Sequence, residues 1–477
     1  MHQKNPYAYK KPDFARLASR YPDFAPLQAF ISESGYASID FHNPAALRAL
    51  TKCLLKEEWN LNVDLREDRI CPTVCGSLDY IYHLLDIESY LPSSSRPLRI
   101  LDIGTGAIAI YPILLHRIRP EAEITATEID DISYEHALKT LKTNDISSPF
   151  IKIQKALSLN PVLFPLLQDV DGEQDIVMCN PPFFGSVQEM EQGMELKERI
   201  PHAAPTAAKN ELITRGGEVT FITSMIQESI TISERCRWYT SLVGKYSSLG
   251  PLVDLLRGSQ IDNYFIKPIK QARTSRWIIG WSHGPWRLPD SVSRPEQIFS
   301  NTSFARLLPP SNTYILTPRP RLSISDLKAK IVDILKTIGM NPSNGSSDPA
   351  EYNQSNPNII TVAPSVISWS RAARRQAARS EKSKEQEDKV GPPNEPHKPL
   401  PILRARLSFV STMLGKQYTD RAPEEDAHLQ VDWLEGRRES RELLENFCKF
   451  ILSKADMSRK RPADDSYDQS NKEHKRT

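Results

Sequence analysis

The 477-residue sequence has few cysteines and no long apolar segment. Its six cysteines are scattered without a C-x-x-C pair, so neither a disulfide framework nor a zinc site is expected. No apolar run approaches the roughly 20 residues of a membrane-spanning helix, and the N-terminal stretch MHQKNPYAYKKPDF lacks the apolar core of a secretory signal. The net charge of +2 provides no global attraction for nucleic acid, so such binding would need local basic patches. We therefore expect a soluble intracellular protein with no metal ion and no membrane partner.

Strand-like and helix-like segments alternate from Leu98 to about Trp281. This alternation predicts an α/β fold with a doubly wound, mostly parallel, Rossmann-like sheet that ends in an antiparallel pair. Within it, GEVTFITSMI (217–226) is interpreted as a strand that leads into a helix. The expected organisation is an N-terminal helical region (1–95), the α/β domain (96–287), a linker (288–312), a small C-terminal α+β module (313–455) with a disordered insertion (371–399), and a basic tail (456–477).

The segment LRILDIGTGAIAIYPILL (98–115) is typical of a cofactor-binding first crossover. Gly104 and Gly106 permit a tight turn and a close backbone approach. Position 109 is alanine, so the full G-x-G-x-x-G is absent, which disfavours NAD and favours S-adenosylmethionine. Asp102 could bind near the methionine ammonium, and Glu128, at the tip of the next strand, suits ribose hydroxyls. Alternatively, this is an ordinary glycine turn with a solvated carboxylate.

The stretch MCNPPFFGS (178–186) ends the fourth predicted strand with residues that cannot continue it. The Asn180 side-chain oxygen and the Pro181 carbonyl could accept both N–H groups of a planar amine and stabilise the charge that develops on methylation. Pro182 would stiffen the loop, and Phe183 or Phe184 would stack on the base. Alternatively, the prolines only terminate the strand and the aromatic rings cap the core.

Cations and aromatic rings interleave in the N-terminal segment, as expected for a surface that binds phosphates and unpaired bases. The cations are Lys4, Lys10, Lys11, Arg16 and Arg20, and the rings are Tyr7, Tyr9, Phe14 and Tyr21. The alternative is a solvated charged helix.

Several motifs together resemble the methyltransferase-like protein 16 family over about residues 4 to 283. These motifs are KKPDFARLASRYPDF, DIGTG, TEIDD, CNPPFF, RWYTSLVGK and ARTSRWIIGW. The resemblance implies a seven-stranded class I methyltransferase that uses S-adenosylmethionine to methylate adenosine N6 in U6 small nuclear RNA, with structured mRNA hairpins as further substrates. It implies a catalytic tetrad of Asn180, Pro181, Pro182 and Phe183. It also implies RNA contacts from the N-terminal cations and from Arg273 and Arg276.

The cofactor contacts implied by the resemblance are Gly104, Glu128 and Asn180, and the glycine turn itself adds Asp102 and Gly106. The expected cofactor site also includes three positions where this sequence departs from the family. Ser77 stands in place of an arginine, Ile108 in place of a serine, and Ala156 in place of a threonine. Lys155 matches a lysine of a loop that gates cofactor entry in the family. A fungal member, acting as a monomer, is expected.

Two basic clusters in SRKRPADDSYDQSNKEHKR (458–476) resemble a bipartite nuclear localisation signal, so a nuclear protein, present also in the cytoplasm, is expected. Two other functions remain open. One is N-methylation of another base or of protein glutamine, because N-P-P-F is shared by enzymes for these substrates. The other is RNA binding by a non-catalytic protein that retains the fold.

Overall fold

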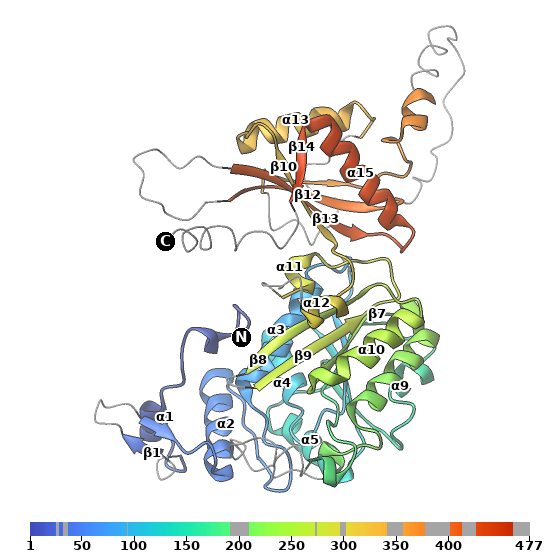
Figure 1. The fold of residues 1–477 in the computed structure, drawn as a ribbon. Helices are drawn as coiled ribbons and strands as arrows, with labels where there is room; N and C mark the ends of the chain where they lie inside the picture. The colour runs from blue at the N-terminus through green and yellow to red at the C-terminus, as the bar shows by residue number, and fades with distance from the viewer. Residues whose placement is uncertain are drawn as a thin grey trace, which may run out of the picture. The chain divides into compact units, whose positions relative to one another are not determined.

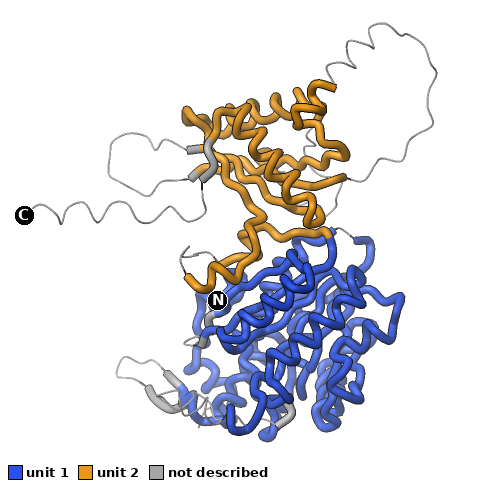
Figure 2. Tube along the Cα trace, turned by 45° about the vertical axis from the view of Figure 1, so that its right-hand side comes forward, with its two compact units in different colours: residues 1–284 blue, residues 285–477 orange. Residues whose placement is uncertain are grey.

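The computed structural model describes residues 1–24, 28–31, 37–92, 94–190, 209–271, 274–295, 302–340, 356–376, 401–412 and 426–460. The chain divides into two compact units, Met1–Gly284 and Pro285–Thr477 (Figure 2). The first unit therefore includes the N-terminal helical region as well as the α/β domain. Among the helices of the described ranges, none is long and apolar enough to cross a membrane.

A seven-stranded sheet forms the centre of the first unit (Figure 1), which confirms the predicted Rossmann-like fold. Its strand order is β5-β4-β3-β6-β7-β9-β8. The parallel strands are β3 (Arg99–Ile103), β4 (Glu123–Glu128), β5 (Ile151–Lys155), β6 (Gln174–Cys179) and β7 (Cys236–Val243). The hairpin of β8 (Tyr264–Gln271) and β9 (Thr274–Trp281) adds the antiparallel edge.

The parallel strands β3 and β6 lie in the middle of the sheet and are deeply buried. From their second residue onward, β3 and β6 are buried throughout, as parallel strands covered on both faces require. The covering helices are α3 (Val74–Glu88), α4 (Ile110–Ile118), α5 (Asp131–Thr143), α6 (Phe164–Gln168), α9 (Gly217–Ile232) and α10 (Tyr246–Gly258). In Figure 1, α9 and α10 lie together on one side of the sheet, and α3 and α4 lie on the other.

The strand order determines where this sheet can bind a ligand. From β3 the chain moves outward to β4 and β5, and then returns to place β6 on the other side of β3. Ile103 and Cys179 are paired at the ends of these two neighbouring strands. Ligands of open α/β sheets bind at such a switch point, outside the carboxyl ends of the strands. The turn after β3 and the segment after β6 therefore meet at one place.

The N-terminal region ahead of α3 consists of short elements and one longer helix, α2. These elements are η1 (Pro6–Ala8), α1 (Phe14–Arg20), β1 (Gln28–Ile31), β2 (Ala37–Ile39) and α2 (Pro44–Trp59). Asn43 caps α2 by accepting hydrogen bonds from the N–H groups of Ala45 and Ala46, and the helix ends at Asn60 in a left-handed conformation.

The expected strand in GEVTFITSMI is wrong, because these residues begin the helix α9. The β-branched residues favour a strand locally. However, Ile222, Met225, Ile226 and Ser229 are buried at helical spacing, so burial of this stripe decides the structure. The chain turns into the helix through Gly216 and Gly217, both at positive φ.

The second unit has its own five-stranded antiparallel sheet and its own core. The strand order is β11 (Ile359–Val362), β12 (Arg404–Thr412), β13 (Asp426–Glu435), β10 (Thr313–Pro318) and β14 (Met457–Lys460). Helices α13 (Ile324–Lys336) and α15 (Ser440–Ala455) contribute to the core around Trp433 and Phe447.

Two short helices, α11 (Asp290–Ser293) and α12 (Ser303–Leu307), occupy the segment expected to be a linker. In the expected disordered insertion, residues 371–376 are helical, and residues 377–399 lie outside the described ranges. Strand β14 occupies the first part of the expected basic tail, and residues 461–477 likewise lie outside the described residues.

Candidate active site

Asn180 follows the last residue of β6 and keeps an unused acceptor. Its side-chain oxygen is buried and has no hydrogen-bond partner among the described residues. Pro181 is buried, and Pro182 and Phe183 are partly buried. A buried acceptor without a partner costs about 1–3 kcal/mol, so a ligand donor that reached this oxygen would recover that energy.

Asp102 provides the second unpaired acceptor group, on the neighbouring strand β3. Both of its carboxylate oxygens are buried without a hydrogen-bond partner in the described part of the chain. Burial, together with the nearby charge of Glu128, raises the pKa of the Asp102 carboxyl to about 7. This carboxyl is therefore suited to a cationic ligand, which would return it to the ionised form.

The turn after β3 leaves room for a ligand beside its backbone. Gly104 and Gly106 both have φ +72°, which L side chains rarely adopt. A Cβ atom built on either glycine meets no atom within 4 Å. The Gly104 N–H donates to the Thr127 hydroxyl at 3.2 Å, which ties the turn to the end of β4.

Glu128 fastens the same turn while keeping part of its acceptor capacity. Its Oε2 accepts a 2.8 Å hydrogen bond from Gly106 N–H, and its Oε1 accepts two, also at 2.8 Å, from Ile129 and Asp130 N–H. Burial raises the pKa of this carboxyl. Oε2 retains a lone pair for a further donor, as contact with a ribose hydroxyl would require.

Three predicted cofactor positions contribute in different ways. Ser77 is buried in the first turn of α3. Ile108 and Ala156 are buried too, and their side chains have no polar atom to offer a ligand. The Ala156 N–H donates to the Glu128 carbonyl at 2.8 Å, which places Ala156 next to the tip of β4.

Lys155 donates to the Ile129 carbonyl at 2.6 Å and pairs with Asp131 at 2.8 Å.

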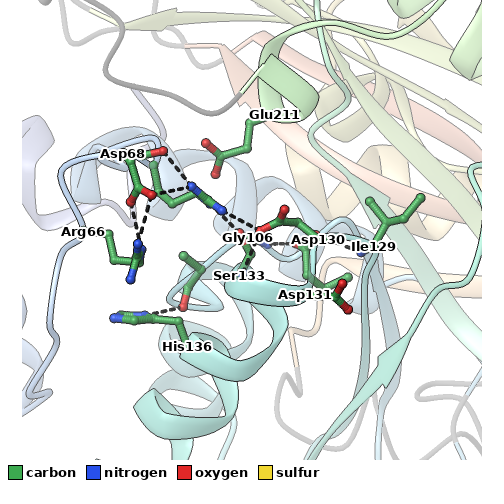
Figure 3. A network of polar contacts seen from close by, with 12 residues as sticks. Arg66, Asp68, Gly106, Ile129, Asp130, Asp131, Ser133, His136 and Glu211 are labelled. Carbon is green, nitrogen blue, oxygen red and sulfur yellow. Dashed lines mark hydrogen bonds and ion pairs between the residues drawn. The ribbon is translucent and has the colours of Figure 1, made fainter.

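A buried arginine that sequence reasoning missed, Arg69, braces the β4–α5 corner. Figure 3 shows Asp130 and Ser133 of this corner. Arg69 is 6% exposed; it pairs with Asp130 at 2.7 Å and donates to the Ser133 hydroxyl at 2.9 Å. Although burial opposes it, these contacts hold the pKa of Asp130 at about 2. Asp130, two residues after Glu128, in turn caps α5 by accepting from Ser133 N–H. The aspartate pair of TEIDD indicates such a cap, but nothing local indicates its partner 61 residues away.

The Phe183 ring lies close to two other elements. The Arg276 guanidinium lies over it, 4.3 Å from the ring centroid. A Cβ added to Gly244, at the end of β7, would lie 2.7 Å from Phe183 Cδ1. Burial lowers the pKa of Arg276, which is therefore a partly desolvated cation beside the aromatic ring.

Buried Glu218, in the first turn of α9, holds the segment that follows β7. Sequence reasoning also missed this role. The Glu218 carboxylate accepts hydrogen bonds from Gly244 N–H at 2.7 Å, Lys245 N–H at 3.0 Å and the Ser248 hydroxyl at 2.6 Å. The segment after Phe183 is held by backbone pairing, because Phe184 N–H donates to the Leu212 carbonyl at 2.9 Å in α8 (Lys209–Leu212).

The predicted RNA-binding cations differ in how much of their charge remains available. Lys4 pairs with Asp86 at 3.1 Å, and Arg16 and Arg20 both pair with Glu57. Lys10 and Lys11 are exposed. Arg273 lies outside the described residues, whereas Arg276 belongs to the Phe183 site.

Among the predicted stacking rings, Tyr9 is 80% exposed, but Tyr7 is buried and the expectation that it binds a base is wrong. Near the same segment, His2, His83 and Asp86 bring possible metal-ligand atoms within 4.8 Å of one another. His2 Nε2 already contacts Asp86 at 2.7 Å, and the Lys4 ammonium occupies the same carboxylate. These contacts anchor the N-terminal segment to α3.

Comparison with known proteins adds independent findings. The profile of a family described as RNA methyltransferase matches residues 1–284. The Xenopus laevis RNA N(6)-adenosine-methyltransferase mettl16 is 38% identical over 288 residues, which cover 59% of this chain and 52% of that protein. The Schizosaccharomyces pombe U6 small nuclear RNA (adenine-(43)-N(6))-methyltransferase is 33% identical over 343 residues, 71% of this chain and 82% of that protein. The chain spans about half the length of the vertebrate relatives it matches.

Solved structures resemble the first unit. The human METTL16 catalytic domain in complex with a MAT2A 3'UTR hairpin matches with 34% identity and a TM-score of 0.53, covering 59% of this chain and 95% of that one. The N-terminal domain of human METTL16 in complex with SAH matches with 35% identity and a TM-score of 0.50, covering 59% and 98%.

Proposed function

The chain belongs to the methyltransferase-like protein 16 family of RNA methyltransferases, and on this premise we propose that it transfers a methyl group from S-adenosylmethionine to adenosine N6 in RNA. The observation that carries the proposal is the buried, unpaired Asn180 oxygen at the carboxyl end of β6, beside the turn after β3. U6 small nuclear RNA is the target that the names of its relatives support, and the hairpin bound by a similar structure supports further structured RNA substrates.

The residues around the β3 turn fit S-adenosylmethionine. The unpaired Asp102 carboxylate would bind the methionine ammonium, and Glu128 Oε2 would accept from a ribose hydroxyl. The open space beside Gly104 and Gly106 admits the cofactor close to the backbone. When bound, S-adenosylmethionine supplies an electrophilic methyl group on a sulfonium sulfur. The SAH complex of a similar structure supports this choice.

The loop after β6 would prepare the adenine amine for the incoming methyl group. The amine lone pair is delocalised into the ring, so the nitrogen is a poor nucleophile. Asn180 Oδ1 and the Pro181 carbonyl would each accept one N–H, which favours a pyramidal nitrogen and stabilises the developing positive charge. The proton leaves to water after the transfer. Phe183 would stack on the base, which must leave its helical stack to be reached.

The direct test uses labelled S-adenosylmethionine, the purified protein and a U6-like hairpin. We expect label in the RNA, and no label when the target adenosine is replaced by inosine, which lacks the exocyclic amine. Label that persists in the inosine RNA would point to another base. Label in protein glutamine would support glutamine N-methylation instead. Cofactor binding without any transfer would support a non-catalytic RNA-binding protein.

We also propose that the protein is fungal and nuclear. The alignment with the fission yeast relative extends over 343 residues, beyond the 288 aligned with the Xenopus relative, which supports a fungal origin. The basic clusters of 458–476 support nuclear import. A fluorescent fusion should lose nuclear accumulation when the clusters are neutralised, and unchanged accumulation would argue against this signal.

A further inference from the structure

The end of β6, which leads into Asn180, is paired with a neighbouring strand on one side only. Along β3 the pairing continues to Ile103 and Cys179. Along β7 it stops at Val177 and Tyr239. Alternate residues of a strand direct their N–H and C=O groups to the same neighbour, so the Val177 carbonyl and the Cys179 N–H both face β7. The Val177 carbonyl belongs to the last pair of this ladder, whereas the buried Cys179 N–H lies beyond it and needs another partner.

Two buried side chains extend the hydrogen bonding beyond the end of this ladder. The Thr240 hydroxyl donates to the Val177 carbonyl at 2.9 Å. The Tyr80 hydroxyl accepts from Cys179 N–H at 3.3 Å and lies 2.8 Å from the Thr240 oxygen. Both residues are 0% exposed.

One arrangement of protons satisfies all three contacts. The single Thr240 proton is on the Val177 carbonyl, so Tyr80 must donate to Thr240, and its own lone pair accepts from Cys179 N–H. Burial raises the pKa of the Tyr80 phenol well above its usual value, so the donor proton stays in place at neutral pH. The hydrogen bonds therefore form a continuous chain from Thr240 on β7, through Tyr80 on α3, to Cys179, the residue before Asn180.

We propose that Tyr80, supported by Thr240, is a positioning residue for methyl transfer. The hydrogen bond to Cys179 N–H fixes the Met178–Cys179 peptide, one residue before Asn180, and thereby restricts the direction of the buried Asn180 oxygen. Displacement of a reacting group by about 1 Å can cost on the order of a hundredfold in rate. This inference rests on the proposed function, because it assigns the oxygen to the adenine amine.

The test compares Tyr80→Phe with Tyr239→Phe in the full chain. The two phenols match: Tyr239 is also 0% exposed, and its hydroxyl donates one hydrogen bond, at 3.1 Å, to the Ser233 carbonyl, near the amino end of β7. We expect Tyr80→Phe to lower kcat by about tenfold or more, with the KM for RNA and the Kd for S-adenosylhomocysteine within about twofold. Tyr239→Phe should lower Tm similarly but leave kcat unchanged.

Thr240 provides a second pair of variants in case Tyr80→Phe does not fold. Thr240→Val removes the hydroxyl with little change of shape and should lower kcat, whereas Thr240→Ser should keep it. Wild-type kcat in both Tyr80→Phe and Thr240→Val would overturn the inference, as would an equal loss in Tyr239→Phe. A wild-type protein without transfer would instead contradict the proposed function itself.

Discussion

Asp102 and Asn180 show how the site prepares for ligands at the scale of single residues. Each keeps a buried acceptor that no described side chain or backbone group satisfies. Such groups cost about 1–3 kcal/mol each, which the surrounding core must offset. Their ligands differ, because a carboxylate favours a cation and a neutral amide oxygen favours an amine N–H. On the proposed function, Asp102 would therefore serve cofactor binding and Asn180 recognition of the methyl acceptor.

The raised pKa of Asp102 predicts that cofactor affinity depends on pH. Its pKa rises from an ordinary value of 3.8 to about 7, so the unliganded protein carries a proton there at pH 6. An ammonium ligand needs the carboxylate and must displace that proton. We expect the affinity for S-adenosylhomocysteine, measured by calorimetry, to rise from pH 6 to pH 7.5 and then level off.

The folded state binds this proton more tightly than the unfolded state does. The group therefore stabilises the unliganded protein most at low pH, and that contribution is lost as the pH rises through about 7. Asp102→Asn should bind the cofactor analogue weakly, with little dependence on pH. A wild-type affinity that is constant over this range would contradict the assignment.

At the scale of elements, α9 and the segment before α10 support the loop that contains Phe183. Glu218, in the first turn of α9, accepts hydrogen bonds from Gly244 N–H and from the Ser248 hydroxyl of α10. Gly244 in turn lies against Phe183. We expect Gly244→Ala to displace the Phe183 ring and to lower kcat by about tenfold, since the reacting geometry depends on this loop.

Gly250→Ala is the matched control, because a Cβ at Gly250, inside α10, meets no atom within 4 Å. It should leave kcat unchanged, and no gain in stability is expected, because Pro251 follows and disfavours a helical conformation for a residue with a Cβ atom. Equal kinetics of the two alanine variants would show that Gly244 does not position Phe183.

The N-terminal segment predicts a graded response to charge removal. Lys10 and Lys11 are exposed, whereas Lys4 pairs with Asp86. We expect Lys10→Ala/Lys11→Ala to weaken RNA binding and to reduce the salt dependence of log Kd by about one for each phosphate that is no longer neutralised. Fluorescence anisotropy at several salt concentrations measures both effects. Lys142→Ala, on α5, is the control, and an equal effect there would indicate nonspecific charge.

Sequence patterns predict the elements better than the interactions between them. The turns after β3 and β6 can be located because glycine and proline have strong local effects. The start of α9 resembles a strand in sequence because its buried stripe depends on the sheet it covers. Arg69, Glu218 and Tyr80 cannot be assigned from sequence, because their partners lie far away along the chain.

At the scale of the whole molecule, the two units have separate cores and separate sheets. The match to the RNA methyltransferase profile ends at residue 284, where the first unit also ends. We expect residues 1–284, expressed alone, to fold cooperatively and to keep kcat within about threefold of the full chain, since a domain with its own core can fold alone. Circular dichroism and single-turnover transfer would check this, and an unfolded fragment would contradict it.

Nucleoside analysis of the product RNA tests the central claim most directly. The full chain is incubated with S-adenosylmethionine and a U6-like hairpin, and the RNA is digested and analysed by mass spectrometry. The proposed methyl transfer to adenosine N6 predicts N6-methyladenosine as the new nucleoside. It also predicts that Asn180→Ala lowers the yield by about a hundredfold, a loss typical of removing one preorganised polar group, while RNA affinity is retained. A different methylated nucleoside, or wild-type yield from Asn180→Ala, would contradict it.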